Sequence, residues 1–320
     1  MFENTKKKLK INLGLIGTGN WGKNYIATIN KINHIELVAI LKSNQIKPSG
    51  IKSNCKVFTK YEDFISFQKF DGIIIASPPN THCEIASKLI LEKIPIIIEK
   101  PLTTKLIEAK SLLKLAQQNK GIVLVDHVFL YHSTFRLIKK YITDTNNINS
   151  IESIGGNKGP YRRDVTPLWD WGPHDIAMCL KIMESVPIEI KAEKISSKNN
   201  SKISENIKIN LVFENKTEAK ILIGNNFLEK KRKFTLYNKQ EIISFNPFIQ
   251  NELICQNIAD KKIINFSIRK NEYNFNKLPL NNLLDHFYNL IYNGESNLSD
   301  LRLGVEVTKI LDSVNNLITK

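Results

Sequence analysis

The sequence has few cysteines, no long apolar run and too few acidic residues to balance its basic ones. Its four cysteines, Cys55, Cys83, Cys179 and Cys255, are widely separated, whereas zinc sites and redox dithiols need closely spaced cysteines. The apolar runs fall far short of the ~18 residues that a membrane helix needs. Residues 1–10 are polar and lysine-rich and lack the apolar core of a secretory signal. We therefore expect a cytoplasmic protein with no metal site and no membrane span.

The charge of the chain is strongly positive. Lysine and arginine number 46 against 31 aspartates and glutamates, which gives a net charge of +15. The basic residues are spread along the whole chain, with dense runs at residues 6–8 and 230–233. Nucleic-acid binders gather their basic residues on one face or stripe. The even spread favours solvated lysines, with anionic small-molecule ligands as the alternative, and we expect no nucleic-acid partner.

Residues 11–126 alternate short apolar runs with helical patterns. A helical stripe that includes Tyr25, Ile26 and Ile29 separates the first two strand-like runs. Such alternation predicts a parallel sheet covered by crossover helices. We therefore predict an α/β fold whose first domain, residues 1–126, is a doubly wound Rossmann domain. Its expected strands are residues 11–16, 36–41, 73–76, 95–98 and 122–125.

The pattern changes after residue 126. A helical segment at 133–141 is followed by strand-like runs with short links, which is typical of an open, mostly antiparallel sheet. The chain from residue 280 onward is helical again. We predict an α+β domain over residues 127–320 for substrate binding and oligomerisation, as a homodimer or homotetramer, because an open sheet leaves one face to cover. The expected strands are residues 188–195, 207–213, 219–223, 234–237 and 241–245.

A glycine motif lies between the first strand and its helix. Residues 17–22 read Gly-Thr-Gly-Asn-Trp-Gly and fit the pattern G-x-G-x-x-G. In this setting glycines allow a tight turn and close approach of the backbone to a pyrophosphate, and the helix N-terminus supplies N–H donors. The alternative is a glycine turn without a ligand. The candidate cofactor-binding residues here are Gly17, Thr18, Gly19, Asn20, Trp21 and Gly22.

The end of the second strand bears on the choice of cofactor. Sites for NAD usually carry a carboxylate here, which accepts a hydrogen bond from the ribose 2′-hydroxyl. This chain has Lys42 and Ser43 instead, and an ammonium and a hydroxyl attract a 2′-phosphate. We therefore predict NADP as the cofactor, with NAD as the alternative; Lys42 pointing into solvent is the competing interpretation.

Two further loops follow parallel strands and must lie at the edge where such sheets bind ligands. Residues 77–82 follow the strand at 73–76, and Glu99-Lys100-Pro101 follows the strand at 95–98. Pro101 restricts the backbone of Lys100 and so holds a cation at this edge. A lysine placed near the nicotinamide can hydrogen-bond a hydroxyl that loses its proton. The candidate cofactor-binding residues of these loops are Ser77, Pro78, Asn80, His82, Glu99 and Lys100.

A third cluster follows in the second half of the chain. Asp170 and His174 are four residues apart and share one face if the segment opens a helix, with Pro173 at a tolerated early position. An imidazole beside a carboxylate makes a general base near neutral pH, and a purely structural His–Asp pair is the alternative. The candidate substrate-binding residues are His127, Tyr131, Tyr161, Arg162, Trp169, Asp170 and His174.

Taken in order, the glycine motif, the two loops and the Asp-x-x-x-His element resemble the Gfo/Idh/MocA family of oxidoreductases. The resemblance implies a Rossmann domain followed by an open-sheet domain. It further implies hydride transfer between nicotinamide C4 and a sugar or polyol carbon. By the family pattern the catalytic set is Lys100, Asp170 and His174, with His174 accepting the proton of the substrate hydroxyl.

Residues 159–164 and 168–175, with 127–132 upstream, look most like members that act on nucleotide-linked sugars in surface-polysaccharide biosynthesis. Those members oxidise the 3-hydroxyl of a UDP-N-acetylhexosamine or its uronic acid. Lys42 departs from the acidic residue of the members that use NAD. Two alternatives stay open, namely a dehydrogenase of a free polyol or hexose such as an inositol, and a non-catalytic regulator that senses NAD(P) or a sugar.

Overall fold

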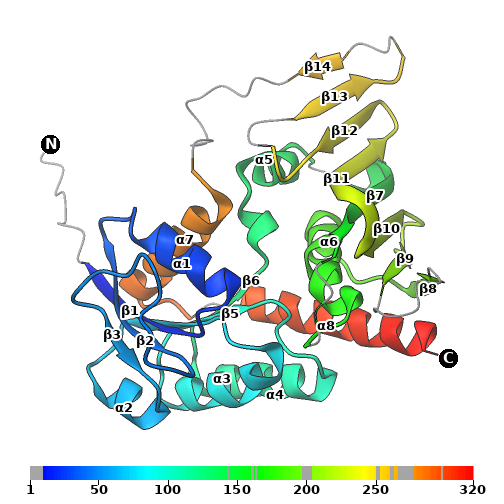
Figure 1. The fold of residues 1–320 in the computed structure, drawn as a ribbon. Coiled ribbons are helices and arrows are strands. Elements are labelled where there is room, and N and C mark those ends of the chain that lie inside the picture. Colours follow the sequence, from blue (N-terminus) through cyan, green and yellow to red (C-terminus); the bar gives the residue numbers. More distant parts are fainter. Residues whose placement is uncertain are drawn as a thin grey trace, which may run out of the picture. The chain divides into compact units, whose positions relative to one another are not determined.

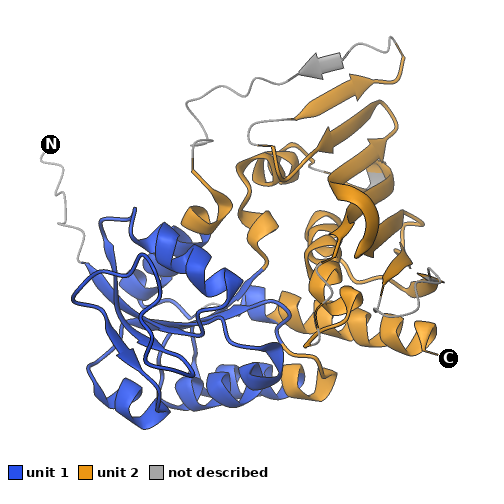
Figure 2. Ribbon diagram, viewed as in Figure 1, with its two compact units in different colours: residues 1–102, 110–126, 283–301 blue, residues 103–109, 127–282, 302–320 orange. Residues whose placement is uncertain are grey.

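The chain forms two compact units (Figure 2). Unit 1 comprises residues 1–102, 110–126 and 283–301, and unit 2 comprises residues 103–109, 127–282 and 302–320. The predicted domain division at residues 126 and 127 stays a prediction. The computed structural model describes residues 10–142, 144–159, 162, 164–196, 204–249, 253–259, 263–265, 277–296 and 298–319.

Unit 1 is built on a six-stranded sheet in which all pairs are parallel, in the order β3-β2-β1-β4-β5-β6 (Figure 1). Strand order reverses between β1 and β4, which confirms the predicted doubly wound Rossmann sheet. The strands are β1 Ile11–Ile16, β2 Ile35–Leu41, β3 Lys56–Phe58, β4 Gly72–Ile75, β5 Ile96–Glu99 and β6 Val123–Asp126. The helices are α1 Asn20–Ile29, α2 Tyr61–Ser66, η1 Pro79–Thr81, α3 His82–Leu91 and α4 Leu106–Asn119, of which residues 110–119 belong to this unit.

The central strands of this sheet carry continuous runs of isoleucine. Residues 73–75 of β4 and 96–98 of β5 are completely buried. Helices cover both faces of a parallel sheet, so its inner strands are apolar on both sides rather than alternating. Strand β3 and helix α2 are additional to the predicted elements, because elements this short show no readable periodicity.

Unit 2 contains an eight-stranded sheet in the order β14-β13-β12-β11-β7-β10-β9-β8. Its pairs are antiparallel except for the parallel pair β7–β10, which confirms the mostly antiparallel sheet. The strands are β7 Ile148–Lys158, β8 Glu189–Ser196, β9 Glu205–Val212, β10 Glu218–Gly224, β11 Asn226–Asn238, β12 Glu241–Phe245, β13 Ile254–Asn257 and β14 Ile263–Asn265.

Helix α6, Pro167–Met183, packs against β7 and β10 (Figure 1). Gly172 allows the close approach, because a Cβ there would lie 2.9 Å from Leu311 and 3.2 Å from Ile223. The helix begins at Pro167, so the expectation that Pro173 occupies an early position is wrong: Pro173 lies inside the helix and removes one backbone hydrogen bond. The other helices are η2 Val128–Tyr131, α5 Ser133–Tyr141, η3 Thr145–Asn147, α7 Pro279–Asn293 and α8 Ser299–Ile318; residues 283–293 of α7 and 299–301 of α8 belong to unit 1.

Across the described residues, we find no helix that combines the length and the apolarity of a membrane span. The homodimer or homotetramer expected from the open sheet stays a prediction.

Candidate active site

The glycine motif forms the turn from β1 into α1. Gly17 has a φ of +95°, and a Cβ at this position would lie 2.5 Å from the carbonyl oxygen of Ala76 at the end of β4. A Cβ at Gly22 would collide with the carbonyl of Gly17. Glycine is therefore required at both positions, by the left-handed backbone and by the close approach of neighbouring chain segments.

The N-terminus of α1 has the features of a phosphate-binding site. Gly19 is the N-cap and provides no side-chain hydrogen bond to the first turn, and Gly19 and Asn20 are exposed. A Cβ at Gly19 would meet nothing within 4 Å. Unsatisfied N–H groups and the helix dipole attract an anion at such a terminus. The residues present thus fit the diphosphate of a dinucleotide.

Lys42 directly follows β2, as predicted. Its Nζ donates a 2.7 Å hydrogen bond to the carbonyl of Ile46, and Ser43 is exposed beside it. A lysine ammonium has three donors. The loop contact therefore holds the ammonium in place and leaves it further donor capacity for a ligand.

His82 joins the two predicted loops of this edge. Its Nδ1 lies 3.0 Å from the carbonyl oxygen of Pro101, and its Nε2 lies 3.0 Å from that of Ser77. The ring is completely buried, and burial lowers the pKa of His82. His82 thus fixes the position of one loop against the other, while the contacts of Ser77, Pro78 and Asn80 with a cofactor stay predictions.

A buried pair of carboxyl groups lies beside Lys100. Glu99 on β5 is the register partner of Asp126 on β6, and the hydroxyl of Tyr25 donates a 2.6 Å hydrogen bond to Asp126 Oδ2. Burial and the Asp126 charge raise the pKa of Glu99 well above its usual range, and burial raises the pKa of Asp126. Two buried carboxyl groups this close hold one proton between them, which leaves one negative charge near the buried Lys100.

In unit 2, Asp170 and His174 lie on successive turns of α6. Arg162 Nη1 donates a 3.1 Å hydrogen bond to Asp170 Oδ1, and Arg162 also bonds both carboxylate oxygens of Asp164. His174 is buried and its ring packs against Phe129, with 4.7 Å between the ring centroids. The structure thus joins Arg162 to Asp170 and restrains the imidazole of His174 with an aromatic ring.

The residue after His174 forms a buried ion pair that the sequence analysis did not anticipate. Arg232 Nη1 donates a 2.7 Å hydrogen bond to Asp175 Oδ2, and Ser153 Oγ donates to Asp175 Oδ1 at 2.5 Å. The two charged side chains are 1% and 0% exposed. Burial raises the pKa of Asp175 and lowers that of Arg232. This pair ties the His174 segment of α6 to β11.

The remaining predicted substrate residues have different environments. His127 is buried directly before η2, and the backbone carbonyl of Tyr131 accepts a 2.9 Å hydrogen bond from Asn282. Trp169 belongs to the hydrophobic core of unit 2. Tyr161 lies outside the described residues. Their contacts with a substrate stay predictions.

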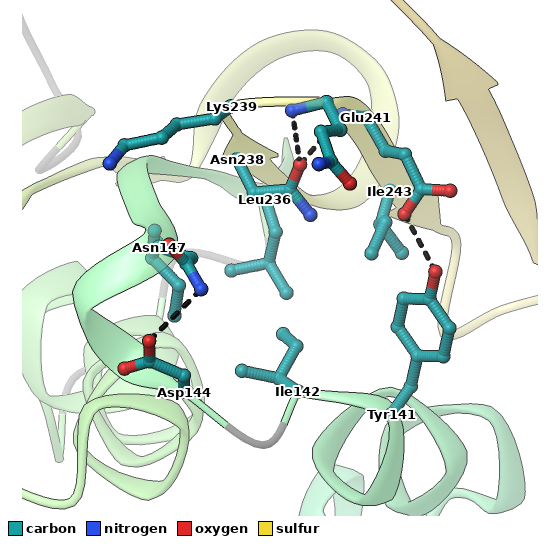
Figure 3. Close-up of a pocket in the computed structure, with 11 residues that line it drawn as sticks. Tyr141, Ile142, Asp144, Asn147, Leu236, Asn238, Lys239, Glu241 and Ile243 are labelled. Carbon is teal, nitrogen blue, oxygen red and sulfur yellow. Dashed lines mark hydrogen bonds between the residues drawn. The ribbon is translucent and has the colours of Figure 1, made fainter.

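A separate pocket of about 240 Å³ lies between α5 and the β11–β12 turn (Figure 3). Several of its polar groups bond to one another: Tyr141 donates to Glu241 at 2.8 Å, and Asn147 donates to Asp144 at 3.0 Å. None of the predicted site residues lines this pocket. It is therefore distinct from the candidate active site.

A doubly wound sheet with a glycine turn before a helix N-terminus is the arrangement that binds dinucleotides in many oxidoreductases. Comparison with protein families agrees: residues 11–127 match the GFO_IDH_MocA model, described as an oxidoreductase family with an NAD-binding Rossmann fold. The glycine motif and both loops of the parallel-sheet edge lie within the matched residues, which confirms the predicted resemblance to the Gfo/Idh/MocA family.

Two curated relatives match part of the chain. A UDP-N-acetylglucosamine 3-dehydrogenase of Acidithiobacillus ferrooxidans is 20% identical over 58% of this chain and 58% of its own length. An inositol 2-dehydrogenase of Corynebacterium glutamicum is 23% identical over 64% of each chain. The match thus spans less than two thirds of either relative.

Solved structures share the fold over nearly the whole chain. A putative oxidoreductase from Magnetospirillum magnetotacticum is 27% identical with a TM-score of 0.84, covering 95% of this chain and 99% of that one. The UDP-N-acetylglucosamine 3-dehydrogenase structure from A. ferrooxidans has a TM-score of 0.82 at 18% identity, covering 97% of this chain and 98% of that one. At that identity the second likeness concerns the fold alone.

Proposed function

We propose that the protein is an NAD(P)-dependent dehydrogenase that acts on the hydroxyl-bearing carbon of a sugar or sugar nucleotide. The proposed catalytic residues are Lys100, Asp170 and His174. The observation that carries the proposal is the arrangement on α6, where a histidine and a carboxylate lie one turn apart. Asp170 is held by Arg162, and His174 is held by Phe129.

The chain's own groups handle the proton and the orientation of the substrate. His174 takes the proton of the reacting hydroxyl at an imidazole nitrogen, and Lys100 donates a hydrogen bond to the same oxygen. Asp170, fixed by Arg162, orients the substrate on the same face of α6. The bound nicotinamide supplies the acceptor or donor for the hydride on the carbon, so that alcohol and ketone interconvert.

The cofactor is proposed to be NADP, with NAD as the alternative. The diphosphate would lie at the N-terminus of α1, against Gly17 and Gly19. The ammonium of Lys42 would meet the 2′-phosphate, because it stands where NAD sites carry a carboxylate. A role in surface-polysaccharide biosynthesis is the proposed setting, supported by the family resemblance of the segments around His174.

The test is turnover of the purified protein, followed by nicotinamide absorbance. NAD and NADP are each combined with UDP-N-acetylglucosamine, N-acetylglucosamine and myo-inositol. We expect oxidation of a sugar substrate, and a loss of about 100- to 10,000-fold in kcat for His174→Ala and Lys100→Ala with cofactor binding retained. His34→Ala, which changes a histidine packed on Tyr288, is the matched control.

Three outcomes would contradict the proposal. Unchanged turnover in His174→Ala removes His174 from the base role. Cofactor binding without turnover of any substrate favours a non-catalytic regulator, and turnover of myo-inositol alone shifts the assignment to a free polyol.

A further inference from the structure

A row of aromatic rings leads from His174 to an exposed loop of unit 2. The His174 ring lies 4.7 Å from the ring of Phe129, and Phe129 lies 6.4 Å from Phe248, centroid to centroid. Phe248 follows β12 and is 42% exposed. The Nζ of Lys230 lies 3.8 Å from the centroid of the Phe248 ring. The row therefore runs from His174, the proposed base, to the exposed ammonium of Lys230.

Local hydrogen bonds fix the loop that carries Phe248. The side-chain Oδ1 of Asn246 accepts a 2.9 Å hydrogen bond from the backbone N–H of Phe248, and the carbonyl of Asn246 accepts one from Ile249. Asparagine commonly closes a turn in this way. The exposed ring is therefore held at one place, and the cation–π contact with Lys230 adds an attraction between loop and strand.

The buried ion pair links β11, near Lys230, to α6 beside His174. Lys230 and Arg232 lie two residues apart on β11 and both contact rings of this row, Lys230 that of Phe248 and Arg232 that of Phe129. Arg232 is bonded to Asp175, the residue that follows His174, and its guanidinium also lies 4.6 Å from the Phe129 ring. A buried charge pair of this kind resists displacement, because separating it leaves a charge without solvent. The part of β11 that carries Lys230 is thereby tied to the segment of α6 that carries the proposed base.

The carboxylates near this row are paired with cations other than Lys230. Asp170 and Asp175, the carboxylates nearest to His174 in sequence, are each bonded to an arginine. Glu229, the residue before Lys230, forms an ion pair with Lys231. The positive charge of Lys230 thus faces the aromatic row.

We propose that Lys230 and Phe248 bind a phosphate group attached to the sugar whose hydroxyl reacts at His174. This inference rests on the proposed function and makes the substrate a phosphorylated or nucleotide-linked sugar. The ring of Phe129, which lies between His174 and Phe248, would contact the C–H groups of the sugar. An ammonium is a compact point charge well suited to a phosphate.

The test compares a charged and a neutral probe with the same sugar. Binding of UDP-N-acetylglucosamine and of N-acetylglucosamine is measured by titration calorimetry on the full chain. For Lys230→Ala we expect UDP-N-acetylglucosamine to bind about tenfold more weakly and N-acetylglucosamine to bind as before. Lys233→Ala is the matched control, since it removes the same charge from another exposed lysine of β11, and its binding should equal that of the wild type.

Further measurements separate this binding role from a general effect of charge. Added salt should weaken UDP-N-acetylglucosamine binding in the wild type more than in Lys230→Ala. Phe248→Leu keeps apolar bulk but removes the ring, and should weaken the nucleotide sugar by a smaller factor. Circular dichroism of each variant establishes that the fold is retained.

The outcomes distinguish this inference from the proposed function. Equal losses in Lys230→Ala and Lys233→Ala, or no binding of UDP-N-acetylglucosamine by the wild type, overturn the phosphate role of Lys230 even if neutral sugars are oxidised. Binding that depends on Lys230, in a protein that oxidises no sugar, supports the phosphate site and overturns the dehydrogenase proposal.

Discussion

The buried Asp175–Arg232 pair allows a quantitative test of how unit 2 holds its site together. The perturbation is Asp175→Asn, which keeps the shape of the side chain and removes its charge. Arg232 then remains 1% exposed without a counter-charge. Breaking a buried pair by neutralising one partner typically costs about 3–5 kcal/mol of unfolding free energy. We expect a loss of this size.

The double replacement Asp175→Leu/Arg232→Met should behave differently. Burial shifts the pKa of Asp175 upward and that of Arg232 downward, so the cost of burying both charges outweighs their attraction. Apolar side chains of similar volume avoid that cost, and such replacements are often neutral or stabilising. We therefore expect the double variant to be at least as stable as Asp175→Asn.

The assay is urea unfolding at constant pH, with the free energy extrapolated to water. The control is Glu84→Gln in the pair Lys88–Glu84, which has the same 2.7 Å separation but lies exposed on α3. Exposed pairs contribute little, so the control should unfold almost like the wild type. A loss below about 1 kcal/mol in Asp175→Asn, or a double variant less stable than the single one, would refute the reasoning.

Two further predictions concern stability at low pH and the cofactor. Burial lowers the pKa of His132 to about 4, and its Nδ1 caps α5 by accepting from the N–H of Thr134. The native state therefore binds fewer protons than the unfolded state between pH 6.5 and 4, and stability should fall by about 3 kcal/mol over that window. His132→Asn keeps a capping group but does not titrate in this range. Urea unfolding of the wild type and of His132→Asn at pH 7 and pH 4 measures the loss, and an equal loss in both proteins would contradict the role of His132. In the second prediction, Lys42→Ala weakens NADPH about tenfold relative to NADH, because a phosphate contact is lost; an unchanged ratio of the two Kd values would reject the role of Lys42.

Much of the fold was predictable because its signals are local. Short apolar runs separated by helical stripes identified five of the parallel strands, and strands β8, β9, β10 and β12 of unit 2 were expected at nearly their observed places. Strand β11 was expected only over residues 234–237, whereas it begins at Asn226. Strand β7 was missed although it is central. It contains Gly155 and Gly156, where a Cβ would collide with the side chains of Arg232 and Phe227. Those glycines are required by tertiary packing, and glycine has a low strand propensity, so the sequence does not indicate a strand here.

Some features of the candidate site were likewise predictable from the sequence, and others were not. By itself, the sequence determined the glycine turn at Gly17, the position of Lys42 after β2 and the helical spacing of Asp170 and His174, because each depends on neighbours along the chain. Only the tertiary structure decided which distant residues meet. The register of β5 with β6 pairs Glu99 with Asp126, and the packing of α6 on the sheet pairs Asp175 with Arg232. In the sequence, Arg232 is part of a basic run that favours solvated side chains. In the structure Arg232 is buried while Lys231 and Lys233 are exposed, because neighbouring side chains of a strand point to opposite faces and packing determines which face is buried.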